Sequence, residues 1–113
     1  MMNDCLFCKM VAGDIKPVVV FENDLILAFR DIKPQAPTHI LIIPKLHIPT
    51  LDDLEDKTLA GELLLAARLI AQQEGMSENG YRTVLNCRGD GGQEVYHLHM
   101  HLLGGRRMLW PPG

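Results

Sequence analysis

The chain has 113 residues, of which 47% are hydrophobic and 22% are charged, and its formal net charge is −3. This length and apolar content predict one domain over residues 1–113. The acidic balance speaks against nonspecific nucleic-acid binding, which needs a basic surface, and no apolar run reaches the roughly 20 residues that cross a bilayer. We therefore expect neither nucleic acid nor a membrane as a partner. The N-terminal residues lack the regions of a signal peptide, so we expect a cytoplasmic location.

The first half of the chain predicts one short helix and three strands. Residues 6–12 are expected to form the helix. Residues 18–21 and 25–30 are two β-branched and apolar runs separated by a polar turn, which predicts a hairpin. Residues 38–43 then predict a continuous apolar strand.

A long helix and two further strands are expected in the second half. Apolar residues recur at helical spacing at Leu59, Leu63, Ala66, Ala67 and Ile70. Asp52 and Asp53 are candidate N-terminal caps of this helix, and Gly75 is its candidate C-terminal stop. Residues 81–87 and 96–103 predict the fourth and fifth strands. Runs of strands around one main helix indicate the α+β class.

Three histidines alternate with apolar residues near the C-terminus, in the segment HLHMHLL (97–103). In a strand, side chains two apart lie on one face, so His97, His99 and His101 are expected to share a face opposite the leucines and methionine. The glycine-rich run at 89–92 lies just upstream, and such backbone can bind an anion through its N–H groups. Phosphate chemistry with a histidine nucleophile or acid–base is one interpretation. A metal site is the other, because neutral imidazole is a common metal ligand.

A second group of residues with chemical potential is the pair Cys5 and Cys8. A Cys-x-x-Cys pair supports a metal site or a redox site, and the redox interpretation expects a βαβ context that this chain lacks. Two inert buried thiols are the third possibility. The third cysteine, Cys87, makes the number odd, which speaks against a disulfide scaffold.

Together these segments resemble the histidine-triad (HIT) family, and in particular its Hint branch. The similarity covers the chain from about Asp4 to Gly113. Besides the triad, the matching segments are FRDI (29–32), PQAPTH (34–39), IPK (43–45), GGQ (91–93), GGR (104–106) and WPPG (110–113). The resemblance implies a five-stranded antiparallel sheet with one long and one short helix, and a homodimer in which two sheets join. It also implies a phosphoramidase that cleaves the P–N bond of purine nucleoside 5′-phosphoramidates and forms a nucleotidyl-histidine intermediate.

The resemblance also implies roles for individual residues. His99 is the expected nucleophile, His101 the expected phosphate contact, and His39 and His97 complete the catalytic group. The expected nucleotide-binding residues are Asp31, Ile32, Asn86, Gly92, Gln93, Glu94, Val95, His99, His101 and Trp110. Asp31 matches the acceptor of the ribose hydroxyls, and Trp110 matches a tail residue that reaches the substrate side of the partner subunit.

Five of these residues also have a plain structural explanation. Asp31, Asn86 and Gly92 can serve turns or strand ends, and Ile32 and Trp110 can serve packing. Glu94 stands where some relatives carry Ser or Thr, so proton donation by a hydroxyl cannot be carried over.

Some HIT proteins bind zinc through such a cysteine pair and two histidines. The matching set here is Cys5, Cys8, His47 and His97, a tetrahedral Cys2His2 combination. We expect such a zinc ion to be structural, with no metal needed for catalysis.

Three other functions remain open beside the phosphoramidase. Other HIT branches include dinucleoside polyphosphate hydrolases and nucleotidyl transferases. A nucleotide-binding regulatory protein with incidental hydrolysis is a second possibility. A zinc hydrolase that uses the whole triad as ligands is the third.

Overall fold

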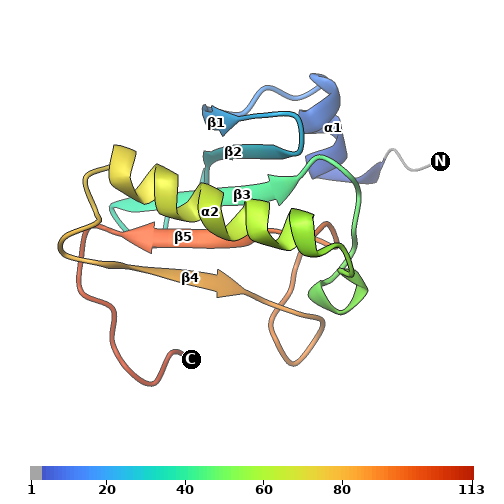
Figure 1. The fold of residues 1–113 in the computed structure, drawn as a ribbon. Coiled ribbons are helices and arrows are strands. Elements are labelled where there is room, and N and C mark those ends of the chain that lie inside the picture. The colour runs from blue at the N-terminus through green and yellow to red at the C-terminus, as the bar shows by residue number, and fades with distance from the viewer. Residues whose placement is uncertain (1–3) are drawn as a thin grey trace.

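The computed structural model describes residues 4–113, which form a five-stranded sheet covered on one face by a long helix (Figure 1). The strands are β1 (Val19–Glu22), β2 (Ile26–Arg30), β3 (Thr38–Pro44), β4 (Tyr81–Leu85) and β5 (Met100–Gly104). They are antiparallel throughout, in the order β1-β2-β3-β5-β4. The helices are α1 (Leu6–Ala12) and α2 (Lys57–Gln73), and a 3-10 turn lies at Leu51–Asp53. This arrangement confirms the predicted α+β class.

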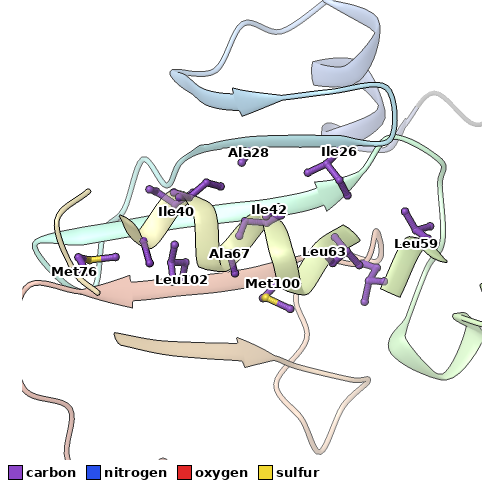
Figure 2. Close-up of a cluster of buried hydrophobic side chains, with 14 residues drawn as sticks. Ile26, Ala28, Ile40, Ile42, Leu59, Leu63, Ala67, Met76, Met100 and Leu102 are labelled. Atoms are coloured by element: carbon purple, nitrogen blue, oxygen red, sulfur yellow. The ribbon is translucent and has the colours of Figure 1, made fainter. Parts of the chain in front are cut away.

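The alternation of side chains along the central strands creates two separate apolar layers. Ile26 and Ala28 on β2, with Ile40 and Ile42 on β3, face α2 and are fully buried. Figure 2 shows these residues between the sheet and the helix, opposite Leu63 and Ala67 of α2. The predicted apolar positions of the long helix all lie in this core, so the helical spacing found in the sequence is the face that α2 buries.

The intervening residues of the same strands face the other side of the sheet. Leu27 and Phe29 on β2, with Leu41 and Ile43 on β3, pack there against Phe7 of α1. Phe7 is the buried residue of this short helix. A sheet with apolar side chains on both faces therefore has a second layer, which α1 covers only in part.

Of the two expectations for the ends of α2, one is wrong and one is confirmed. The N-cap is Asp56, whose Oδ1 accepts hydrogen bonds from the backbone N–H groups of Thr58 and Leu59 at 2.9 and 3.2 Å. The expectation that Asp52 or Asp53 caps the helix is therefore wrong, because both lie in the separate 3-10 turn. Gly75 has a positive φ of 74° and its N–H bonds to the Gln72 carbonyl, so the predicted C-terminal stop is confirmed.

The last two strands are shorter than the sequence indicates. The expected strand at 81–87 ends at Leu85, and that at 96–103 begins only at Met100. Residues 97–99 run beside the segment that follows β3 instead, where the Leu98 N–H bonds to the Ile48 carbonyl at 2.6 Å. None of the helices within residues 4–113 combines the length and apolar character needed to cross a bilayer.

Candidate functional site

A cleft of about 550 Å³ opens on the sheet face opposite α2. Its walls come from α1 and the segment after it, from the end of β2, and from the loop between β4 and β5. This volume lies in the range of small-molecule sites. His99 and His101 both line it, so the cleft contains two of the three triad histidines.

The triad keeps the predicted alternation although regular strand pairing begins only at Met100. Leu98, Met100 and Leu102 lie in the core beneath α2. The histidines point to the opposite face, where His99 and His101 reach the cleft. His97 is fully buried and lies beside the two cysteines near α1. The three imidazoles thus share a face of the sheet, but two of them line the cleft and the third lies beside the cysteines.

His99 is held in one tautomer by the backbone. Its Nδ1–H donates to the carbonyl oxygen of His97 at 2.8 Å, which leaves the lone pair on Nε2. The ring is 8% exposed and packs edge-on against His101, with ring centroids 5.1 Å apart. A ring that lines a cleft and has its lone pair on Nε2 is the arrangement that a nucleophile needs.

His39 and His101 form a hydrogen-bond chain that also fixes their protons. The backbone N–H of Gln35 donates to Nδ1 of His39 at 3.0 Å, so the proton of a neutral His39 ring is on Nε2. That Nε2–H donates to Nδ1 of His101 at 2.9 Å, and the proton of His101 is then on its own Nε2. Burial lowers the pKa of His39, and burial together with His99 lowers the pKa of His101 to about 4. Both rings are therefore neutral at pH 7, and His101 can donate a hydrogen bond.

His39, which we expect to support the triad, contacts His101 through this hydrogen bond. Asp31 lies beside the middle of this chain, with Oδ2 3.5 Å from the same Nε2 of His39 that bonds to His101. Its Oδ1 accepts the Lys33 N–H at 2.8 Å, which fixes the carboxylate at the rim of the cleft. Ile32, beside it, is 91% exposed and also lines the cleft.

The loop between β4 and β5 supplies the opposite rim. Four of the residues expected to bind the nucleotide line the cleft there, namely Asn86, Gly92, Glu94 and Val95. Gln93 does not. Its side chain is buried beneath the loop, where Oε1 accepts the Arg88 N–H and Nε2 donates to the Pro49 and Val95 carbonyls. In this chain Gln93 holds the loop in shape.

The sequence interpretation missed the apolar wall of the cleft. Leu6, Phe7 and Met10 of α1 contribute to it, together with Phe29 and Leu41 of the sheet. Their apolar character could not identify them as part of a binding site, because any buried helix or strand has such residues. Trp110, by contrast, is 81% exposed and lies outside the cleft of its own chain.

The four predicted metal ligands lie together. Nδ1 of His97 is 3.3 and 3.5 Å from the Sγ atoms of Cys5 and Cys8, and 3.2 Å from Nδ1 of His47. The Cys8 Sγ is 3.2 Å from the His47 Nδ1. Zinc bond lengths of about 2.0 Å to nitrogen and 2.3 Å to sulfur give tetrahedral edges of about 3.3 Å between nitrogens and about 3.5 Å between nitrogen and sulfur. The donor set and its spacing therefore fit a tetrahedral metal ion.

Hydrogen bonds from neighbouring groups orient the ligand atoms of this metal-ligand cluster (Cys5, Cys8, His47 and His97). Nε2–H of His97 donates to the Pro44 carbonyl at 2.8 Å, so the lone pair of this ring is on Nδ1 and faces the other three side chains. The backbone N–H of Cys8 donates to the Cys5 Sγ at 3.3 Å. These partners orient the ligand atoms before any ion binds.

Comparison with known proteins gives relatives over nearly the whole chain. The model of the HIT domain matches residues 12–108. The purine nucleoside phosphoramidase of Escherichia coli strain K12 is 51% identical over 94% of this chain and 91% of its own. A 14 kDa zinc-binding protein of Zea mays is 51% identical over 96% of this chain and 87% of its own.

A solved structure agrees with these sequence matches. The HIT family hydrolase from Legionella pneumophila superposes with a TM-score of 0.94 and 60% identity, covering 96% of this chain and 99% of that one. The triad, the cleft beside it and this extended similarity lead to one conclusion: the chain belongs to the histidine-triad (HIT) family.

Proposed function

We propose that this protein is a hydrolase that cleaves the P–N bond of purine nucleoside 5′-phosphoramidates. The observation that carries the proposal is His99, which lines the cleft and whose Nδ1–H bonds to the His97 carbonyl, so that the lone pair is on Nε2. The similarity to a purine nucleoside phosphoramidase of E. coli supports the choice of substrate. It is the similarity, and not the shape of the cleft, that favours purines.

The reaction takes place in two displacements. Nε2 of His99 attacks the α-phosphorus and forms a P–N bond to the ring, while the bond to the amine breaks and the amine leaves with a proton taken from solvent water. Water then attacks the phosphorus and gives one proton to the solvent, the bond to His99 breaks, and the nucleoside monophosphate is released. Two steps with a covalent intermediate replace one difficult displacement. No metal takes part in either of them.

His101 stabilises the charge that develops on the phosphate. The hydrogen-bond chain from Gln35 through His39 places a proton on Nε2 of His101, beside His99. Fixed donors of this kind are effective because they need not reorganise during the reaction. His39 acts as the positioning residue of this donor.

The remaining cleft residues bind the nucleotide. Asp31, an acceptor when ionised, bonds the ribose hydroxyls, and Ile32 with the apolar wall packs against the base. Asn86, Gly92, Glu94 and Val95 form the phosphate side. Glu94 carries a negative charge there, which suits a protonated or cationic leaving group better than the phosphate itself.

Two further features belong to this proposal. The chain forms a homodimer in which the tail with Trp110 reaches the partner's cleft, which accounts for a tryptophan that is 81% exposed in one subunit. The metal-ligand cluster holds one structural Zn²⁺, as the ligand spacing and the zinc-binding relative of maize support.

The test compares adenosine 5′-monophosphoramidate with diadenosine polyphosphates as substrates for wild type and His99→Ala. We expect turnover of the phosphoramidate, and a loss of more than about 100-fold in the variant with AMP binding retained. Near-normal turnover by His99→Ala would refute the covalent mechanism. Faster cleavage of diadenosine polyphosphates would assign the chain to another HIT activity.

A further inference from the structure

Phe7 lies between the metal-ligand cluster and the cleft. It stands on the first turn of α1, between Cys5 and Cys8. Its ring is edge-on to His97, with centroids 5.8 Å apart, and edge-on to His99 at 5.2 Å. One buried side chain thus touches both a ligand of the cluster and the proposed nucleophile.

The helix that carries Phe7 is short, and besides Phe7 its Met10 and Val11 pack in part against the apolar layer of the sheet. α1 has seven residues, and Phe7 is its buried one. A helix this short is not stable by itself in water, so tertiary contacts must hold it. Two of the four cluster ligands, Cys5 and Cys8, lie at its start. The other two, His47 and His97, belong to segments at the ends of β3 and β5, so an ion in the cluster joins α1 to the sheet.

The position of α1 also determines the shape of the cleft. Leu6, Phe7 and Met10 line its apolar wall, and the segment that follows the helix continues that wall through Ile15. If α1 moves away from the sheet, the surface that packs against the base is lost.

From these contacts we infer that Zn²⁺ in the metal-ligand cluster sets the affinity of the cleft for nucleotides, with Phe7 as the positioning residue between the two. The inference rests on the proposed function for the identity of the ligand. It adds that metal occupancy controls binding and leaves the chemical step unchanged.

The chemical step is insulated because the hydrogen bonds that orient His99 do not involve α1, although Phe7 packs against its ring. Its Nδ1–H donates to the His97 carbonyl. The backbone there is held by the Leu98 N–H to the Ile48 carbonyl at 2.6 Å, and the His97 ring by its bond to the Pro44 carbonyl at 2.8 Å. None of these bonds involves α1. Loss of the ion should therefore raise Kd and KM and leave kcat at saturation nearly unchanged.

The experiment uses His47→Gln, with Leu46→Ala as its matched control. Both side chains are exposed and lie in the same loop, but only His47 belongs to the cluster. Zinc content, the Kd of AMP by calorimetry, and kcat and KM for adenosine 5′-monophosphoramidate are measured. If α1 is docked about a tenth of the time without the ion, Kd and KM rise about tenfold. The control should keep its zinc and all three constants.

Two measurements keep the test decisive if His47→Gln folds poorly. Wild type stripped by a chelator and reloaded with Zn²⁺ should lose and regain AMP affinity, and amide exchange in the peptide that contains α1 should be faster without zinc. Phe7→Leu keeps all four ligands, so it should keep its zinc and still bind AMP more weakly.

Three results overturn the inference. Zinc-free protein that binds AMP as tightly as loaded protein refutes the coupling and leaves the proposed function intact. A fall in kcat that matches the rise in Kd refutes the insulation of His99. Wild type that binds no AMP refutes the proposed function and this inference with it.

Discussion

Gly91 offers a sharp test of how the loop between β4 and β5 positions the phosphate side of the cleft. A Cβ added at Gly91 would lie 2.5 Å from the carbonyl oxygen of Cys87 and 2.6 Å from its nitrogen. Ordinary contacts begin at 3.4 Å, so the loop must shift by about 0.9 Å, and both obstacles are backbone atoms that cannot rotate away. Gly89, in the same turn, has nothing within 4 Å of its added Cβ and is the matched control.

We expect Gly91→Ala to lower kcat/KM for adenosine 5′-monophosphoramidate by about 100-fold, because a misplacement near 1 Å costs that much in a positioned site. The free energy of unfolding should fall by about 1–3 kcal/mol, the usual cost of overpacking. Gly89→Ala should stay close to wild type in both kcat/KM and the free energy of unfolding. Steady-state kinetics and urea denaturation of the three proteins measure this. Equal activity and stability of the two variants would show that the loop adapts freely and does not position the phosphate.

Three further outcomes are expected. Asp56→Ala should lower the free energy of unfolding by about 1 kcal/mol in urea denaturation, because the Asp56 carboxylate caps α2. Asp52→Ala, on the exposed 3-10 turn, should lower it less, and equal decreases would contradict the capping assignment. The pKa of His101 is about 4 in the folded chain and 6.5 in the unfolded one, so the unfolded state takes up the proton first. The stability that its neutral form provides is complete above about pH 6.5 and is lost as the pH falls toward 4. The difference in free energy of unfolding between wild type and His101→Gln should therefore change between these pH values. A constant difference would refute the lowered pKa of His101. Removal of residues 108–113 should alter substrate preference or rate more than the melting temperature, because these terminal residues are largely exposed; a fully active monomer by light scattering would contradict the dimer.

The fold class and the faces of its elements could be predicted from the sequence because they follow from local periodicity. The alternation at 97–103 placed three imidazoles opposite Leu98, and helical spacing placed Leu63 under the sheet, and both agree with the structure. Boundaries were less predictable. Asp52, Asp53 and Asp56 are equally good caps by residue type, and only the path of the chain decides which one meets free N–H groups.

The tertiary structure determines the different surroundings of the three triad histidines. Sequence spacing treats His97, His99 and His101 as equivalent. The fold brings Cys5, Cys8 and His47 to His97, and it brings His39, 62 residues away in sequence, to His101. It also buries Gln93 under its loop and makes Phe7 a wall of the cleft. Contacts between residues far apart in the chain depend on how strands and loops pack against one another, and no local pattern encodes them.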